Sequence, residues 1–311
     1  MGGIHLGHDH SHDHTHGANK KALMVSFIII TIYMVIEAIG GFLTNSLALL
    51  SDAGHMLSDS ISLGVGFLAF TFSEKVANYR NTYGYKRFEI LAAVFNGVTL
   101  ILISLYIFYE AYHRFTDPPE VASTGMLTIA VIGLIVNIIV AWILMRGDTE
   151  ENLNLRAAFL HVLGDLLGSI GAITAALLIM FFNWGWADPV ASVIVAVLVL
   201  ASGWRVTKDA VHVLMEGTPK NVDMDEIIHT IENLPEIINI HDLHVWSITS
   251  GQNALSCHAV VDGNLSVHKS QELLRTIEHE LEHKGIGHVT IQMESEEHPH
   301  EDSLLCSHES E

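Results

Sequence analysis

The sequence predicts an α-helical membrane protein, in which six transmembrane helices precede a small cytoplasmic α+β domain of order αββαβ, close to ferredoxin-like. Six apolar stretches each reach the ~20 residues that span the hydrocarbon of a bilayer. The last third of the 311-residue chain is polar and holds more than half of the acidic residues. A mean hydropathy of +0.37 and a charged fraction of 16% also exclude an ordinary soluble enzyme.

Turn residues separate the apolar stretches. Asn45 lies after the first stretch, Asp117–Pro119 after the third and Asn183–Pro189 after the fifth. In the last of these turns, Trp184 and Trp186 stand where an aromatic belt meets the lipid headgroups. The six expected spans are Ala22–Leu43, Ser46–Phe72, Phe88–His113, Thr124–Met145, Leu153–Phe182 and Ala187–Val206.

The basic residues predict the orientation of these spans. In a six-span arrangement Arg114 alone flanks one side, and the other basic residues near the spans all flank the opposite side. The positive-inside rule then places both termini in the cytoplasm and makes this a multi-pass protein of the cell membrane. Those other residues are Lys20, Lys21, Lys75, Arg80, Lys86, Arg87, Arg146, Arg156, Arg205 and Lys208. Because the net charge is −20 and there is no basic patch, nucleic acid is excluded as a partner.

Composition divides the chain into four segments. A histidine-rich cytoplasmic tail (1–21) precedes the six-helix transmembrane domain (22–209), the cytoplasmic α+β domain (210–296) and an acidic C-terminal tail (297–311). Cys257 and Cys306 both lie in the polar third. Two thiols without a secretory context predict no disulfide and suit a reducing cytosol.

The polar domain has the patterns of two helices and three strands. Asp223 is placed to cap a helix that runs to Leu234 and ends before Pro235. Ser266–Lys284 is a second helix with one apolar face. Runs of β-branched and apolar residues predict strands at Ile237–Ile248, Ala254–Val261 and His288–Met293.

Two matching motifs lie inside the second and fifth spans. His55 precedes Asp59 by four residues, and His161 precedes Asp165 by the same interval. Because four residues make about one helical turn, the His and Asp of each motif share a helix face. An isolated Asp near the bilayer centre costs on the order of 3 kcal/mol, so such residues persist only where something offsets that cost. Two imidazoles and two carboxylates facing one another predict a tetrahedral Zn²⁺ site.

Further polar residues accompany the motifs as a possible ion pathway. Asp52 lies on the helix face of the first motif, and Asn154 lies on that of the second. Glu37 in the first span and Asn137 in the fourth either line an ion route or bond to a neighbouring helix. The structural alternative for each motif is a local His–Asp hydrogen bond between packed helices, and the duplication of the motif argues against it.

Histidine is also abundant outside the expected spans. The N-terminal run is either an expression tag or a flexible segment that captures metal and tunes its local concentration. Its histidines are His5, His8, His10, His12, His14 and His16. In the polar domain His241 and His258 lie on the two strands of one hairpin, so these two can approach each other unless they are surface histidines of an acidic domain.

One motif points to an enzyme that the rest of the chain does not support. His279-Glu280-Leu281-Glu282-His283 matches the H-E-x-x-H pattern of zinc proteases. Leu281 belongs to the buried stripe of its helix, so the two histidines project towards solvent and lack a third ligand. A membrane-embedded zinc hydrolase is disfavoured too, because four protein ligands leave no position for an activated water. The sequence therefore predicts no enzyme and no catalytic cofactor.

Together these residues resemble the cation diffusion facilitators, and among them the bacterial cadmium, cobalt and zinc efflux antiporters. The resemblance covers nearly the whole chain and rests on Ser51–Asp59, Tyr83–Glu89, Leu160–Asp165, Glu216–Pro219 and His241–Trp246. It implies a homodimer with one transport site in each subunit, whose ligands are His55, Asp59, His161 and Asp165. It also implies zinc binding in the cytoplasmic domain, near the dimer contact, at His241 and His258, with Glu294 and His288 as further positions.

We therefore expect exchange of cytoplasmic Zn²⁺ for H⁺ across the lipid bilayer, with Cd²⁺ and Co²⁺ as secondary substrates. The predicted site has a charge of −2 that Zn²⁺ neutralises, and protons compete for the same imidazoles near neutral pH. The sequence leaves open the physiological metal, the stoichiometry, the dimer contacts and whether K⁺ is a second counter-ion. The alternative is a membrane-anchored zinc sensor that signals through its cytoplasmic domain.

Overall fold

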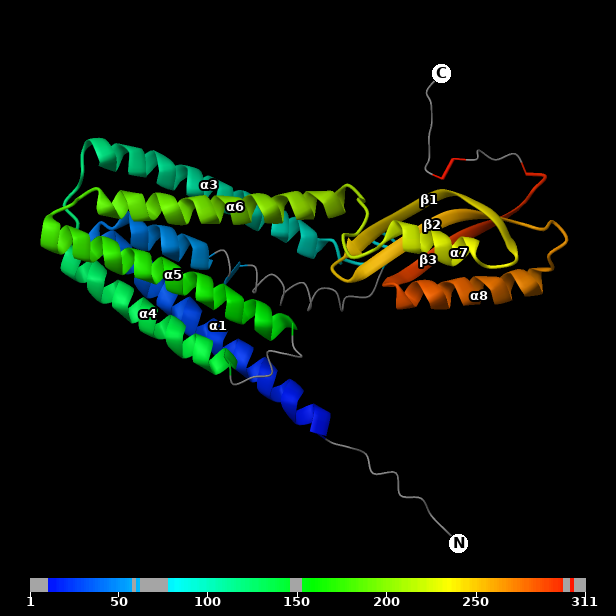
Figure 1. Ribbon diagram of the computed structural model, residues 1–311, viewed down its shortest axis with the longest axis horizontal. Coiled ribbons are helices and arrows are strands. Elements are labelled where there is room, and N and C mark those ends of the chain that lie inside the picture. Colours follow the sequence, from blue (N-terminus) through cyan, green and yellow to red (C-terminus); the bar gives the residue numbers. More distant parts are fainter. Residues whose placement is uncertain (1–10, 58–59, 62–77, 146–152, 299–302, 305–311) are drawn as a thin grey trace, which may run out of the picture. The chain divides into compact units, whose positions relative to one another are not determined.

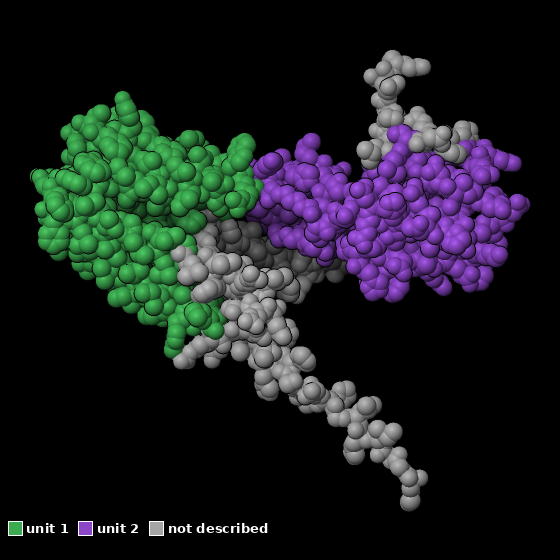
Figure 2. Space-filling view, viewed as in Figure 1, with its two compact units in different colours: residues 1–64, 95–205 green, residues 65–94, 206–311 purple. Residues whose placement is uncertain are grey.

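The computed structural model describes residues 11–57, 60–61, 78–145, 153–298 and 303–304 (Figure 1). The chain forms two compact units, coloured separately in Figure 2. Unit 1 comprises residues 1–64 and 95–205, and unit 2 comprises residues 65–94 and 206–311. Unit 1 holds most of the apolar helices, and unit 2 holds the sheet domain.

The apolar part of the chain is helical, as predicted. Among the described residues, five helices are long and apolar enough to cross a membrane. Helical residues 47–57 and 60–61 belong to the second expected span, the rest of which lies outside the described residues. The labelled helices are α1 (Ser11–Thr44), α3 (Phe88–Thr116), α4 (Ser123–Met145), α5 (Leu153–Phe182) and α6 (Ala187–Leu214).

Close packing within unit 1 depends on small residues at helix contacts. Helix α4 packs against both α1 and α5 (Figure 1). Gly203 of α6 lies against α3, where an added Cβ would come within 2.8 Å of the Leu100 Cβ and 3.0 Å of the Gly97 carbonyl oxygen. These glycines allow apolar helices to approach closely without a hydrophobic driving force between them.

Two helices extend beyond the lengths expected from hydropathy. Helix α1 begins at Ser11, so the expectation of a flexible N-terminal tail is wrong for residues 11–21, which include His12, His14 and His16. His5, His8 and His10 lie outside the described residues. Helix α6 continues to Leu214, and the domain boundary expected at residues 209–210 falls inside it. Hydropathy locates the membrane, whereas backbone hydrogen bonds propagate a helix whatever the polarity of its side chains.

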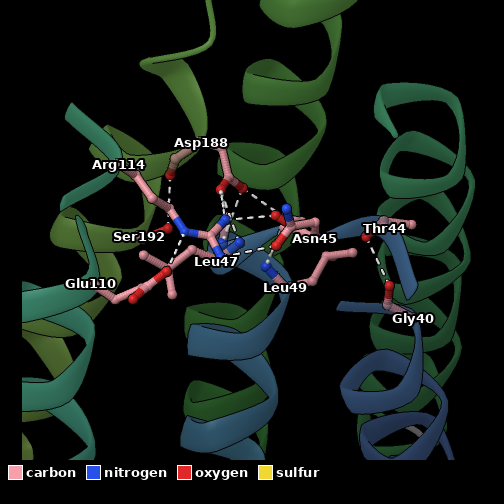
Figure 3. A network of polar contacts seen from close by, with 11 residues as sticks. Gly40, Thr44, Asn45, Leu47, Leu49, Glu110, Arg114, Asp188 and Ser192 are labelled. Carbon is pink, nitrogen blue, oxygen red and sulfur yellow. Dashed lines mark hydrogen bonds and ion pairs between the residues drawn. The ribbon is translucent and has the colours of Figure 1, made fainter. Parts of the chain in front are cut away.

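The carboxylate of Asp188, in α6, caps the helical segment that begins at residue 47 (Figure 3). Its Oδ1 accepts hydrogen bonds from the Ser46 hydroxyl at 2.7 Å and from the Ala48 N–H at 3.1 Å. Its Oδ2 accepts from the Leu47 N–H at 2.8 Å. The first N–H groups of a helix have no partner within that helix, so this carboxylate satisfies donors that would otherwise be orphaned in an apolar environment.

Arg114, in α3, balances the charge of this cap. Its guanidinium Nη1 lies 3.6 Å from the Asp188 Oδ2 and donates a hydrogen bond of 2.6 Å to the Asn45 carbonyl oxygen (Figure 3). Its Nε donates to the Glu110 carboxylate at 2.9 Å. Arg114, the single basic residue expected on its side of the spans, is thus a buried ion-pair partner that joins α3 to the turn between α1 and the next helix.

The cytoplasmic domain has the predicted element order, αββαβ. Strand β2 lies in the middle of a three-stranded sheet, antiparallel to β1 and parallel to β3. The core between helices and sheet contains Ile231, Leu255, Ile277 and Leu281, each fully buried. The elements are α7 (Met224–Glu232), β1 (Ile237–Thr249), β2 (Gln252–Val261), α8 (Val267–His283) and β3 (Ile286–Ser295).

Both helices of this domain begin at a side-chain cap, and the one at Asp223 is the cap that the sequence indicates. The Asp223 side chain accepts from the N–H groups of Asp225 and Glu226, and the Ser266 hydroxyl accepts from that of Lys269. Leu234 lies beyond the end of α7, because the helix closes with Asn233 as its C-cap, two residues before Pro235. A proline disfavours helical conformation in the residue before it, so the last turn ends early.

We predict that Asp188→Ala destabilises the membrane unit. The substitution leaves Arg114 buried with a weaker set of partners and orphans three donors, and breaking a buried ion pair costs about 3 kcal/mol. The midpoint of thermal unfolding in detergent should fall clearly. Asp117→Asn, at an exposed carboxylate just beyond α3, is the matched control and should leave it unchanged. Equal midpoints for the two variants would contradict the role assigned to the cap.

We predict that the thiol of Cys257 is inert in the folded protein. Cys257 lies in β2 with 1% of its surface exposed, and burial, followed by the charge of Asp242, raises its pKa to about 12. At pH 8 the thiol is therefore protonated and shielded, and the thiolate is the reactive form. In a Cys306→Ser background, maleimide should label the chain only after denaturation. Rapid labelling of the native protein would contradict this account.

Candidate functional site

The second and fifth expected spans bring a histidine and an aspartate together inside the membrane unit. The Nε2 of His55, from helical residues 47–57, lies 3.9 Å from the Oδ1 of Asp165 in α5. Zn²⁺ bonds to nitrogen and oxygen at ~2.0–2.1 Å, so two ligand atoms of a tetrahedral site lie about 3.4 Å apart, and this pair would close by about 0.5 Å to bind one ion. The Asp165 side chain is 1% exposed, while that of His55 is 25% exposed. This pair thus joins a buried carboxylate to a partly exposed imidazole.

The other two expected ligands are less fully described. Asp59 lies outside the described residues. His161 is part of α5, one turn before Asp165, and its side chain lies outside what the structure describes. The described residues therefore show one nitrogen–oxygen pair between two helices, and the four-ligand set stays a prediction.

Buried polar side chains surround this pair. Glu37 of α1 is buried, accepts a hydrogen bond of 3.1 Å from the Tyr33 hydroxyl, and interacts with both Asp52 and Asp165. The sequence left the role of Asn137 open between an ion route and a bond to a neighbouring helix. The structure shows a bond: the Asn137 amide donates to the Ser169 hydroxyl of α5 at 3.4 Å.

The face of the second helix that carries Asp52 lies directly against α5. A Cβ built on Gly168 would come within 2.9 Å of the Asp52 Oδ1, so glycine leaves room for this carboxylate in its observed position. Asp52 is itself 3% exposed. Three acidic residues, Glu37, Asp52 and Asp165, therefore share one buried region of the membrane unit. Asn154, the remaining pathway residue, lies in the first turn of α5, and its side chain is not described.

A second group of metal-ligand side chains lies on the sheet of the cytoplasmic domain. His241 in β1 and His258 in β2 are direct partners in the antiparallel register, as expected from the hairpin. Glu294 in β3 reaches both: its Oε2 lies 3.1 Å from the His241 Nε2, and its Oε1 lies 3.0 Å from the His258 Nδ1. One ligand atom from each of the three lies within 4.8 Å of the others. Two imidazoles and a carboxylate at this separation suit a tetrahedral divalent cation with one open position.

Two further residues contact this cluster, and the sequence did not predict either of them as a neighbour. The Oδ2 of Asp242 lies 3.8 Å from the His258 Nε2, and the Gln292 amide donates to the Glu294 Oε1 at 2.7 Å. Asp242 has a φ of 51° beside an irregularity in the β1–β2 register. A regular strand would place Asp242 on the face opposite to His241, so alternation alone does not identify it as a neighbour.

His288 does not join this cluster, which corrects the expectation that it is a further ligand there. It is paired with Ala254 in the register, whereas Glu294 is paired with Val260, and six residues at ~3.3 Å each separate the two by about 20 Å. Because β3 runs parallel to β2, its first residues align with the start of β2, far from His258. The His288 ring instead packs edge-on against Tyr83, with centroids 5.7 Å apart.

Comparison with known proteins identifies related chains over nearly the full length. Residues 23–215 match the cation efflux transmembrane domain, and residues 219–296 match the cytoplasmic domain of cation efflux proteins. The chain is 68% identical to a cadmium, cobalt and zinc/H(+)-K(+) antiporter of Bacillus subtilis, over 97% of this chain and 96% of the relative. It is 47% identical to the zinc transporter ZitB of Pectobacterium atrosepticum, over 93% and 89% of the two chains. It is 41% identical to the metal cation efflux system protein CzcD of Cupriavidus metallidurans, over 93% and 90%.

We predict that Glu294→Gln weakens zinc binding by the cytoplasmic cluster by tenfold or more. The substitution keeps the size of the side chain but removes the charge that bridges His241 and His258, and loss of a supporting group typically costs ~10–100-fold in metal affinity. The measurement is the rise in the unfolding midpoint of the full chain with added Zn²⁺. Glu232→Gln, at an exposed carboxylate on α7, is the control. A zinc response equal to that of the control would rule the cluster out as a zinc site.

Proposed function

Because this chain belongs to the cation efflux family of multi-pass membrane transporters, we propose that it exports Zn²⁺ from the cytoplasm in exchange for H⁺. The observation that carries this proposal is the approach of His55 to Asp165 between two helices of the membrane unit. The relatives named above support it, because they are named for zinc, cadmium and cobalt transport. We propose Cd²⁺ and Co²⁺ as secondary substrates, since a tetrahedral nitrogen and oxygen shell accepts both.

We propose that Asp59 and His161 complete the transport site with His55 and Asp165. Two ionised carboxylates and two neutral imidazoles carry a charge of −2, which Zn²⁺ cancels, so the loaded site is neutral in a low-dielectric environment. Imidazole titrates near neutral pH, so protons displace the metal and occupy the site on the return step. Access alternates by movement of one group of helices against another around this site.

Glu37, Asp52 and Asn154 are proposed to line the ion route to the site. Glu37 and Asp52 are buried and interact with each other close to Asp165. Buried acids that approach a metal site within a membrane attract cations and exchange protons with them. K⁺ as a second counter-ion rests on the names of the Bacillus relatives, which include H(+)-K(+) exchange.

The remaining organisation is proposed on the same grounds. We expect six spans, with both termini in the cytoplasm. The segment boundaries are expected after residues 21, 209 and 296, and the cytoplasmic domain is expected to be close to ferredoxin-like. The asymmetry of the basic residues supports the orientation. A homodimer is supported by the match of residues 219–296 to the cytoplasmic domain of cation efflux proteins. The His241, His258 and Glu294 cluster is proposed as a structural or regulatory zinc site in that domain.

A zinc sensor without transport is the second candidate, because it too would use the cytoplasmic cluster. It would not need a metal-ligand pair inside the membrane, which is why export is preferred. Metal flux through the reconstituted protein separates the two functions. An exporter moves Zn²⁺ in one direction while protons move down their gradient in the other, and a sensor moves no Zn²⁺.

We predict that Asp165→Ala abolishes zinc export. The substitution removes a buried carboxylate that supplies a metal ligand and half of the charge of the proposed site, while the small side chain keeps α5 intact. Zinc flux should be measured in reconstituted vesicles, with the amount of folded dimer determined in parallel. Glu120→Gln, at an exposed carboxylate, should transport like the parent chain. Near-normal flux through Asp165→Ala would count decisively against the site.

We predict that deletion of residues 2–17 leaves the maximal transport rate largely intact. These residues hold the histidine-rich run, which adjusts the local metal concentration and does not form the transport site. The same vesicle assay should show that half-maximal flux needs a higher Zn²⁺ concentration on the cytoplasmic side. The flux at saturating Zn²⁺ should be unchanged. Complete loss of flux would show that the tail is an obligatory part of the route.

A further inference from the structure

The cytoplasmic domain carries a second pair of histidines, outside the cluster described above. His279 and His283 lie one turn apart near the C-terminal end of α8, and both are exposed, whereas Leu281 between them is fully buried. Their Nε2 atoms are 3.3 Å apart, and the ring centroids are 4.6 Å apart at an interplanar angle of 75°. The two Nε2 atoms are thus close enough to share a proton in the metal-free protein or to share a single cation.

This geometry suits a metal ion. If a cation binds both Nε2 atoms at the ~2.0–2.1 Å typical of zinc–imidazole bonds, a separation of 3.3 Å gives an N–metal–N angle of about 107°. The ideal tetrahedral angle is about 109°. We propose that His279 and His283 form a two-imidazole site for divalent transition-metal cations such as Zn²⁺ and Co²⁺. The site is separate from the transport site and from the His241 cluster.

The charges around the pair favour a cation. Glu278, Glu280 and Glu282 neighbour the two histidines along the exposed face of α8. Two basic residues are also near: Lys284 forms an ion pair with Glu226 of α7, and the exposed Arg275 lies one turn before His279. The local excess of carboxylates raises the concentration of divalent cations near the histidines.

The pair also has room for the remaining ligands of a bound ion. His283 and Glu280 line a cavity of about 380 Å³ between the ends of α7 and α8, whose wall also includes Asp223. Among the described residues, no third histidine, cysteine or acidic ligand atom lies within 4.8 Å of the pair. Two coordination positions are therefore left to water, so the ion exchanges readily with the cytoplasm. Such a site captures metal and clamps the last turns of α8, without the third protein ligand that a zinc protease requires.

The test is site-resolved protection of the histidines in the full-length protein, with Zn²⁺ alone as the probe. Diethylpyrocarbonate modifies exposed imidazoles, and mass spectrometry of the peptides reports the rate at each residue. At a Zn²⁺ concentration of ~10 times Kd, occupancy of about 0.9 should lower the rates at His279 and His283 about tenfold. His279→Gln should abolish the protection of His283, because a single exposed imidazole holds the ion too weakly.

His268→Gln is the matched control, since His268 is an exposed histidine of the same helix with a carboxylate partner, Glu272, one turn away. It should leave the protection of the pair unchanged. Absence of protection in the parent chain overturns the proposal, and so does full protection of His283 in His279→Gln. Equal unfolding midpoints without metal will show that the variants fold alike. The test needs no transport activity, so its failure is distinguishable from failure of the exporter proposal.

Discussion

The membrane unit depends on how the chain reverses direction after α1 and begins a new helix in an apolar environment. Asn45 adopts a φ of 57° at this reversal, and the next helix starts with N–H groups that have no partner of their own. Asp188 supplies the acceptors from α6, and Arg114 supplies the compensating charge from α3. Each member of this network would be costly to bury alone, and together they leave little unsatisfied. The network thereby sets the start of the helix that carries Asp52 and His55.

From that start, packing positions the candidate transport residues. Gly168 lets α5 approach the face of the second helix that bears Asp52, and His55 then comes within reach of Asp165. The buried acids Glu37 and Asp52 lie in the same region. Carboxylates gathered in a membrane interior repel one another, so the arrangement is expensive without a cation or a proton. That cost is the physical reason for proposing that a divalent metal exchanges for protons at this place.

The chain brings two metal-ligand side chains together in three structurally different ways. His55 and Asp165 meet across a helix–helix contact, so their separation responds to movement between helices. His241 and His258 are held opposite each other by backbone hydrogen bonds of a sheet, which is a rigid scaffold. His279 and His283 share one helix face and need only the helix itself. A contact between two helices suits the proposed transport site, a sheet scaffold suits a resident ion, and an exposed helix face suits exchange of the ion with solvent.

Sequence periodicity and composition determined the local features of this protein: the apolar helices, the cap at Asp223, the order of the cytoplasmic elements and the pairing of His241 with His258. Each depends on residues close in the chain or on a short turn, where spacing translates directly into geometry. Tertiary structure decided the features that depend on distant segments. In the sequence, Asp188 lies at the start of one expected span and Arg114 at the end of another. Their pairing arises only when α6 and α3 meet the turn at Asn45. The parallel register of β3 likewise brought Glu294 to the two histidines and carried His288 away, because a register shared between strands far apart in the sequence is set by core packing rather than by local pattern.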